Sequence, residues 1–384
     1  MVRTNFEKKI VNFLASAISI DTQNPPGKEK EFVNFVKRWL KREKVNLKIK
    51  EYEPAPRRSN LILSYGKGKR TLLLLGHTDT VPAGENWKTN PLKAEIKGGK
   101  IFGRGASDDK GPLTSAFFAL VKIAKEKIKL KGKVVLVMAA DEETGGKFGI
   151  DWLIKKKVLK SDFTIVTEPS GISRIEKDEK GLVWVKIKTF GRQAHGSRPE
   201  LGDNAIEKMI KILTELKKLK LEGKHKILGK PTLNIGKIKG GTKVNVVPAS
   251  CEAELDFRIL PGQNEKFITS KLKNIFKKLS FKKGKDFHFE ILHYGAPIEV
   301  SAKDPLVLAL REAIKSVLKK EPEITGTPGG TDRKGILGQK NLHVGVIYGP
   351  GEPETCHIAN EFIKIEDLIK GVEIYKRTIK ELLS

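Results

Sequence analysis

Residues 71–82, TLLLLGHTDTVP, constrain the fold more than any other segment. An unbroken apolar run that ends at Gly76 is typical of a strand buried on both faces, as in a parallel sheet. Active sites of such sheets lie just beyond the carboxyl ends of the strands, where His77 stands. Because Asp79 follows two residues later, both side chains point to one side of an extended chain. A metal-bound imidazole held by a carboxylate needs this geometry, although a strand that simply ends in a polar loop has the same pattern.

Acidic residues follow two further apolar runs. Residues 133–143, KVVLVMAADEE, end in Glu142 and Glu143, and residues 162–170, DFTIVTEPS, contain Glu168. The loop GRGASDDKG adds Asp108 and Asp109 before a predicted helix, where adjacent acids could merely serve as a cap. If the runs are parallel strands, their ends converge on one edge of the sheet. Because clustered carboxylates repel one another, a shared cation is the simplest explanation.

Residues 181–294 have a different character from the rest of the chain. Residues 181–190, GLVWVKIKTF, alternate between apolar and polar, as in a strand with one buried face. The pattern then predicts a helix capped by Asp203, strands at 232–238 and 246–259, a helix at 264–279 and a strand at 287–293. The order β-α-β-β-α-β is ferredoxin-like. We therefore predict an α+β domain at 181–294, inserted into an α/β domain formed by residues 1–180 and 295–384.

The α/β domain is expected to contain a mixed, largely parallel sheet flanked by helices. Amphipathic helices are predicted at 5–17 and 29–43, after residue 112, from Asp304 to about 319 and at the end of the chain. Further strands are predicted at 46–53, 60–64 and 342–348. His357 lies in a polar loop before the last helix.

Two histidines and three carboxylates form a candidate ligand set. Its members are His77, Asp108, one of Glu142 or Glu143, Glu168 and His357. Mixed imidazole and carboxylate donors suit zinc, cobalt or manganese, and the absence of thiolate ligands argues against a cysteine-type structural zinc site. Five ligands are too many for one tetrahedral ion. They suit two ions that share a bridging carboxylate.

Composition limits the partners and the compartment. The chain has 74 Lys and Arg against 46 Asp and Glu, a net charge of +28, but its basic residues are scattered rather than gathered in one block. This distribution favours a charge-rich solvated surface, with steering of anionic substrates or incidental nucleic-acid binding as alternatives. No nucleic-acid motif, no apolar stretch near ~18 residues and no signal peptide is present. With two cysteines, we expect a cytoplasmic protein without a nucleic-acid or membrane partner.

Six motifs in order give the sequence a family resemblance. They are GHTDTVP, GRGASDDKG, DEETGG, TEPSG, QAHGSRPELGDNA and CHIANEF, and they span nearly the whole chain. Each is modest alone, but together they resemble the M20 family of metallopeptidases. That family includes succinyl-diaminopimelate desuccinylase, acetylornithine deacetylase, aminoacylase and glutamate carboxypeptidase. The resemblance implies a zinc-peptidase-like catalytic domain with a ferredoxin-like lid and dimerisation domain.

The resemblance also implies roles in the catalytic domain. His77 and Glu168 would bind one metal, Glu143 and His357 the other, and Asp108 both, with a cis peptide bond after it. Asp79 would orient His77. Glu142 would act as the general base, which takes a proton from the attacking water and passes it to the leaving amine.

Other implied residues lie in or beside the lid domain. His195 would reach the partner subunit of a homodimer and stabilise the oxyanion, unless it is an ordinary loop histidine. Asn245 and Arg258 match substrate contacts, since Arg258 can fork onto a carboxylate, although it could equally pair with a structural acid. Backbone N–H groups at Gly330 and Thr331 would hold the substrate's α-carboxylate.

The expected protein is a dimetal hydrolase that cleaves the amide bond of N-acyl amino acids. Two divalent ions are expected, zinc before cobalt or manganese. A desuccinylase or deacetylase of amino-acid biosynthesis is favoured, and a metallo-carboxypeptidase or dipeptidase acting on short peptides is the alternative within the family. A non-catalytic metal-binding homologue and a basic nucleic-acid binder are alternatives from other classes.

Overall fold

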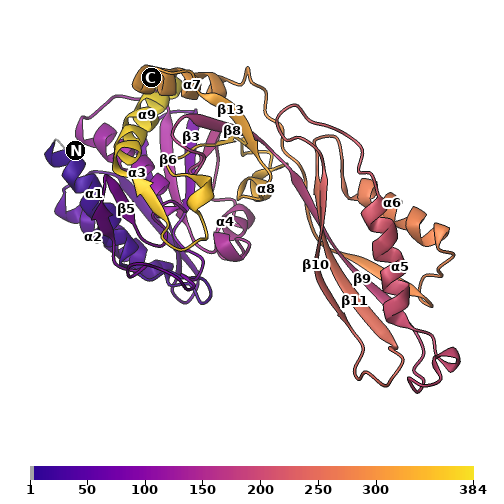
Figure 1. Ribbon diagram of the computed structural model, residues 1–384. Helices are drawn as coiled ribbons and strands as arrows, with labels where there is room; N and C mark the ends of the chain where they lie inside the picture. Colours follow the sequence, from indigo (N-terminus) through magenta and orange to yellow (C-terminus); the bar gives the residue numbers. More distant parts are fainter. Residues whose placement is uncertain (1–3) are drawn as a thin grey trace. The chain divides into compact units, whose positions relative to one another are not determined.

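The computed structural model describes residues 4–384, which divide into two compact units (Figure 1). The first unit contains the chain up to Lys177 together with Val300–Thr325 and Thr331–Ser384. The second unit contains Asp178–Glu299 and Gly326–Gly330. Each unit has a core of its own and is described separately.

A mixed eight-stranded sheet forms the centre of the first unit. The strand order is β1-β2-β6-β3-β7-β14-β8-β13. The central strands β6, β3, β7 and β14 are parallel to one another, whereas β1 with β2, β2 with β6 and β14 with β8 are antiparallel. The strands are β1 (Lys48–Ala55), β2 (Arg58–Gly66), β3 (Thr71–His77), β6 (Lys133–Ala139), β7 (Phe163–Val166), β8 (Arg174–Glu179), β13 (Glu323–Thr327) and β14 (Val346–Ile347). The predicted α/β class with a largely parallel central sheet is confirmed.

The leucine run in β3 is buried on both faces, as its unbroken apolar sequence predicts. Leu73 and Leu75 pack with Ile150 and Leu153 of α4. On the other face, α3 and α9 pack against β3 and β6. The helices of this unit are α1 (Asn5–Ile18), α2 (Glu29–Arg42), α3 (Lys110–Lys125), α4 (Ile150–Lys155), α7 (Pro305–Leu318), α8 (Arg333–Ile336) and α9 (Ile365–Leu383). A small second sheet contains β4 (Glu95–Lys97), β5 (Lys100–Phe102) and β15 (Phe362–Lys364).

The second unit is a four-stranded antiparallel sheet with two helices on one face. Its elements are β9 (Gly181–Phe190), α5 (Ala205–Lys218), β10 (Thr232–Gly240), β11 (Ser250–Ile259), α6 (Glu265–Lys278) and β12 (Phe287–Gly295). The sheet order β10-β11-β9-β12 is the ferredoxin-like one. Val183, Val185 and Ile187 of β9 pack against Met209 of α5 and Leu272 of α6. The alternating apolar residues of β9 therefore face the helices, as the sequence predicts.

Several predicted boundaries are wrong for local reasons. Asp203 does not cap α5, because the Asn204 side chain accepts the N–H groups of Ile206 and Glu207, while Asp203 pairs with Lys208. The strand predicted at 246–259 begins only at Ser250, after a proline, which lacks the N–H that a strand ladder needs. The strand predicted at 342–348 is limited to Val346–Ile347. The strands β8 and β13 and the short helix α8 were not predicted.

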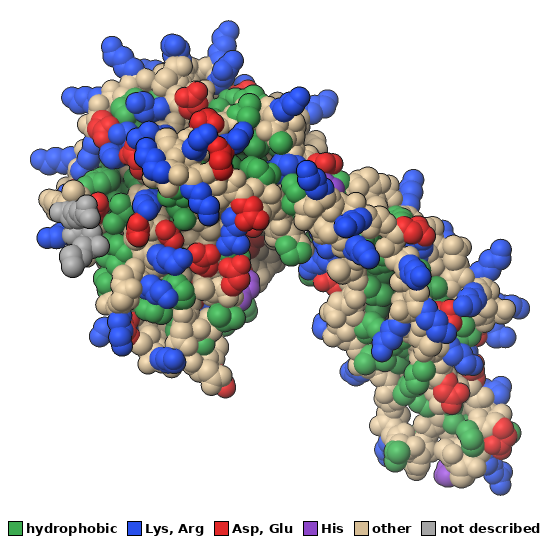
Figure 2. Space-filling model, turned by 45° about the horizontal axis from the view of Figure 1, so that its top comes forward, with side chains coloured by type: hydrophobic (Ala, Val, Ile, Leu, Met, Phe, Trp, Pro, Cys, Tyr) green, Lys and Arg blue, Asp and Glu red, His purple; other side chains and the backbone are tan. Residues whose placement is uncertain are grey.

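The surface matches the even charge distribution of the sequence. Figure 2 shows Lys and Arg side chains spread over the visible face, with acidic side chains among them. Within residues 4–384, no helix has the length and apolar character needed to span a bilayer.

Candidate metal centre

The candidate centre lies in the first unit, where three parallel strands end. His77 is the last residue of β3 and pairs in register with Ala139, the last residue of β6. Glu142 and Glu143 follow in a short 3-10 turn, Glu142–Thr144, and Glu168 lies two residues beyond β7. The loop before α3 supplies Asp108, and the loop before β15 supplies His357. The polar residues that follow the buried strands therefore meet at one edge of the sheet.

Asp108 presents one carboxylate oxygen to each of two imidazoles. Its Oδ1 is 3.1 Å from His77 Nε2, and its Oδ2 is 3.1 Å from His357 Nε2. His77 Nε2 also lies 3.4 Å from Glu168 Oε1, and His357 Nε2 lies 3.2 Å from Glu143 Oε2. The five side chains thus form two groups, His77 with Glu168 and His357 with Glu143, with Asp108 between them.

The donor atoms fit divalent metal ions. The ligand atoms of His77, Asp108 and Glu143 all lie within 4.8 Å of one another, and those of His77, Glu142 and Glu168 do so as well. All are imidazole nitrogens or carboxylate oxygens, which suit zinc, cobalt and manganese. The nearby thiol of Cys356 instead contacts Ser107 Oγ at 3.8 Å.

The charges of the cluster also fit a bound cation. Burial and the neighbouring charge of Asp108 raise the pKa of Glu168. Burial and the charge of Glu168 raise the pKa of Glu142 well above its usual value. Hydrogen bonds to Asp108 and Glu143 raise the pKa of His357 to about 10. Shifts in these directions are those expected of carboxylates that lie close together, and a bound metal ion would relieve their repulsion.

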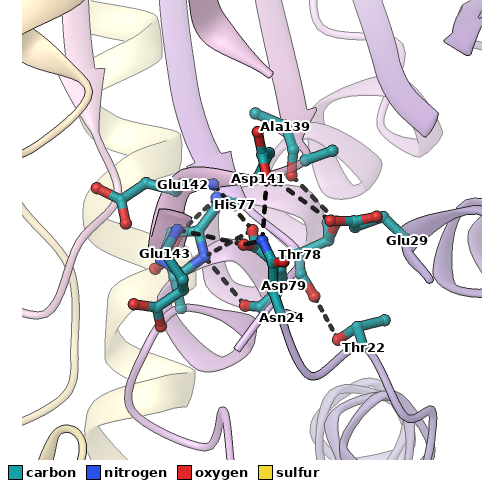
Figure 3. A network of polar contacts seen from close by, with 12 residues as sticks. Thr22, Asn24, Glu29, His77, Thr78, Asp79, Ala139, Asp141, Glu142 and Glu143 are labelled. Atoms are coloured by element: carbon teal, nitrogen blue, oxygen red, sulfur yellow. Dashed lines mark hydrogen bonds and ion pairs between the residues drawn. The ribbon is translucent and has the colours of Figure 1, made fainter. Parts of the chain in front are cut away.

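Asp79 contacts both His77 and the turn that follows β6 (Figure 3). His77 Nδ1 lies 3.0 Å from the Asp79 backbone carbonyl and 3.5 Å from its Oδ1, so the carbonyl is the nearer partner. The Asp79 carboxylate accepts the backbone N–H groups of Glu142 and Glu143, each at 3.2 Å. One side chain therefore ties two strand ends together.

Two carboxylates outside the predicted ligand set hold the Asp108 loop. The Asp108–Asp109 peptide is cis, as the family resemblance implied. Asp109 Oδ2 accepts hydrogen bonds from the His77 N–H at 3.1 Å and from Thr167 Oγ1 at 2.8 Å. Buried Glu361 accepts the N–H groups of Ser107 and Asp108, at 2.7 and 2.9 Å. Sequence reasoning missed the role of Glu361, although it lies in the motif CHIANEF.

The other predicted site residues lie mainly in the second unit. Exposed His195 Nδ1 is 2.7 Å from Ser197 Oγ. Its loop lies beside that of Asn245, whose carbonyl accepts the Gly196 N–H at 2.8 Å. Arg258 pairs with Asp256, an acid of the same unit, with Nε 3.0 Å from Oδ1.

The glycine-rich loop adjoins Arg258. Arg258 donates from its terminal nitrogen to the Pro328 carbonyl at 3.1 Å. The Gly329 N–H donates to Thr327 Oγ1 at 3.1 Å. Gly330 ends the second unit, and Thr331 belongs to the first.

Comparison with known proteins places this chain in a family. Residues 73–381 match the model of peptidase family M20/M25/M40. An uncharacterized metallohydrolase of Methanococcus maripaludis is 33% identical over 413 residues, covering 96% of this chain and 98% of that protein. A probable succinyl-diaminopimelate desuccinylase of Staphylococcus aureus is 27% identical over 401 residues, 96% of each chain. The crystal structure of an M20 family metallo-carboxypeptidase from Sulfolobus solfataricus superposes with a TM-score of 0.77 at 23% identity, over 98% of this chain and 99% of that one.

The protein is thus a metal-dependent hydrolase that contains an α/β unit and a ferredoxin-like α+β unit. It belongs to the peptidase family M20/M25/M40.

Proposed function

We propose that this hydrolase cleaves the amide bond of N-acyl amino acids, as a succinyl-diaminopimelate desuccinylase or an acetylornithine deacetylase of amino-acid biosynthesis does. The observation that carries the proposal is the Asp108 carboxylate, which faces His77 with one oxygen and His357 with the other. The desuccinylase relatives support the choice of substrate class. The proposed setting is the cytoplasm.

Two divalent ions complete the proposed site. His77 and Glu168 would hold one, Glu143 and His357 the other, and Asp108 both. Zinc fits this donor set best, and cobalt or manganese fit it as well. When bound, such ions supply Lewis-acid activation of water and of the scissile carbonyl.

Glu142 is the proposed general base. Its carboxylate lies within 4.8 Å of the ligand atoms of His77 and Glu168, and the proposal assigns it no metal ion of its own. It would accept a proton from the attacking water and deliver it to the leaving amine nitrogen. Burial and the charge of Glu168 raise the pKa of Glu142 above its usual value, which favours acceptance of that proton.

The lid residues have proposed roles on the substrate. In a homodimer formed through the lid domain, His195 would donate to the carbonyl oxygen as it gains negative charge. Asn245 and Arg258 would contact the substrate, and the backbone of Gly330 and Thr331 would hold its α-carboxylate. Arg258 would have to share its guanidinium with Asp256, which leaves it fewer donors for a ligand.

The test is hydrolysis by zinc- or cobalt-loaded protein of N-succinyl-diaminopimelate, N-acetylornithine, N-acetylmethionine and an acyl-glutamate dipeptide. The Glu142→Gln variant should keep two metal ions and lose turnover, whereas Glu85→Gln, a change at an exposed acid, should behave as the parent. Turnover by Glu142→Gln at the parent rate contradicts the mechanism. A preference for the dipeptide would assign a carboxypeptidase or dipeptidase instead. Two bound metals without any activity would favour a non-catalytic homologue.

A further inference from the structure

The turn that carries Glu142 and Glu143 starts from an unusual backbone conformation. Asp141 has φ +69°, in the left-handed region that few residues other than glycine adopt. Its own side chain stabilises the turn, since Oδ1 accepts from Thr144 Oγ1 at 2.6 Å and Oδ2 accepts from the Phe148 N–H at 3.0 Å. The position of the turn thus depends on where the Asp141 carboxylate is held.

Arg58 of β2 holds that carboxylate from one side. Its guanidinium donates to Asp141 Oδ1 at 2.7 Å and, through two nitrogens, to both oxygens of Glu29 at 2.7 and 2.8 Å. A third nitrogen donates to the Pro26 carbonyl at 3.1 Å. Arg58, Glu29 and Asp141 are all buried. One planar cation therefore joins the start of α2, the loop before it and the turn after β6.

Asn24 links the same carboxylate to Asp79 (Figure 3). The Asn24 amide nitrogen lies 2.9 Å from Asp79 Oδ2, 3.1 Å from Asp141 Oδ1 and 3.0 Å from Thr144 Oγ1. Asp79 in turn accepts the N–H groups of Glu142 and Glu143. A neutral donor thus stands between two carboxylates that would otherwise repel each other.

We propose that Arg58 and Asn24 are positioning residues that hold Glu142 and Glu143 in their working places. The inference rests on the proposed role of Glu142 as base and of Glu143 as metal ligand. Without Arg58, the Asp141 carboxylate is buried without its cation, which favours any movement that exposes it to water. The turn would move together with the Asp141 carboxylate. Glu142 would then lose its alignment with the attacking water, and Glu143 would no longer fit the second metal position.

The first experiment compares Arg58→Met and Arg58→Lys with Arg57→Met. Arg57 is the exposed neighbour that pairs with half-buried Glu31, so its loss controls for removal of an arginine. Arg58→Met should lower kcat on the order of 10- to 100-fold, as the loss of partners behind metal ligands does, with little change in KM. Arg58→Lys keeps the positive charge but lacks the planar guanidinium that donates to two carboxylates at once, so its kcat should lie between those of the parent and Arg58→Met. The Arg57→Met variant should match the parent.

The second experiment replaces Asn24 by an isosteric acceptor. Asn24→Asp replaces the amide, which donates to two carboxylates, with a third carboxylate. The control, Asn12→Asp, makes the same change on the exposed side of α1. Asn24→Asp should weaken binding of the second Co²⁺ ion on the order of 10- to 100-fold and alter the visible spectrum of the Co²⁺-loaded protein. Calorimetric titration with Co²⁺ alone and the spectrum give readouts that need no substrate.

These readouts separate positioning from a purely structural role. Lower Tm for Arg58→Met and Asn24→Asp, with the kcat, Co²⁺ affinities and spectrum of the parent, would overturn the proposal. If Arg58→Met does not fold, the same measurements on Arg58→Lys and Asn24→Asp decide whether the two residues position the turn. If the parent hydrolyses none of the substrates, the proposed function fails, while the Co²⁺ titration and spectrum still decide whether Arg58 and Asn24 position the turn.

Discussion

At the scale of single residues, His357 is the proposed ligand whose loss is easiest to measure. It faces Asp108 and Glu143, whereas His77 and Glu168 meet on the other side of Asp108. His357→Ala should therefore lose one of two bound metal ions and keep the other. Elemental analysis after dialysis against metal-free buffer measures the ratio, with exposed His288→Ala as the control. Two ions retained with parent affinities would exclude His357 from the ligand set.

Glu361 offers a second test, of stability rather than of metal binding. Its buried carboxylate pairs with Arg104 at 2.7 Å and accepts N–H groups from Gly105, Ser107 and Asp108. Glu361→Gln leaves the buried Arg104 without its counter-ion, so the free energy of unfolding should fall by about 3 kcal/mol. Urea denaturation measures this loss. Glu366→Gln, which removes an exposed partner of Lys370, should cost less than about 1 kcal/mol.

The sequence predicts that the proposed ligands lie together, but it does not predict the residues that support them. His77, Glu143 and Glu168 follow apolar runs whose ends must converge in a parallel sheet, so a local pattern predicts their meeting. Asn24 and Arg58 have no such pattern. Each contacts Asp141, which lies 117 and 83 residues away along the chain, and a contact at that separation depends on the completed fold.

At the scale of elements, the residue that caps the start of α7 is ionisable, so the stability of this helix end depends on pH. Asp304 Oδ1 accepts the Leu306 N–H at 2.8 Å, and Oδ2 lies 3.1 Å from His343 Nε2. Burial raises the pKa of Asp304, but the hydrogen bonds from His343 and Leu306 outweigh it and hold the pKa below its usual value. The stabilisation by the ionised carboxylate is therefore complete above about pH 4 and is lost as the pH falls through the lowered pKa.

We expect Asp304→Ala to lower the free energy of unfolding by about 1 kcal/mol at pH 7, because the helix loses its cap. The deficit should shrink as the pH falls below about 4. Asp304→Asn keeps a capping oxygen without the charge and should lose less at pH 7. Urea denaturation at pH 7, 5 and 3 measures all three proteins. A deficit of equal size at pH 3 and pH 7 would show that the carboxylate charge contributes nothing.

Strands were predicted correctly where the apolar residues form an unbroken run or alternate with polar ones. The leucines of β3 and the alternation of β9 identify both strands without further information. By contrast, β8 reads RIEKDE and has no pattern that distinguishes it from a loop, and only two residues of the strand predicted at 342–348 form β14. Their pairing with strands distant in sequence, rather than their own composition, makes them strands.

At the scale of the whole molecule, the second unit has what it needs to fold alone. It has its own core between the sheet and two helices. The isolated segment 178–299 should therefore unfold in one cooperative thermal transition, followed by circular dichroism. Phe257→Ala in the same segment should lower Tm strongly, because it empties a fully buried position. A broad, non-cooperative transition in the unsubstituted segment would show that this core is insufficient.

The two ends of that segment have a consequence for how such a protein can evolve. Leu182 pairs with Gly295, and Glu179 pairs with Ile298, so segment 178–299 begins and ends on neighbouring strands. Paired strands lie roughly 5 Å apart, a gap that a two-residue turn closes. A gene could therefore lose or exchange this segment as a cassette without rerouting the rest of the polypeptide. Lineages of this fold could accordingly vary the second unit while the loops that carry His77, Asp108 and His357 are inherited intact.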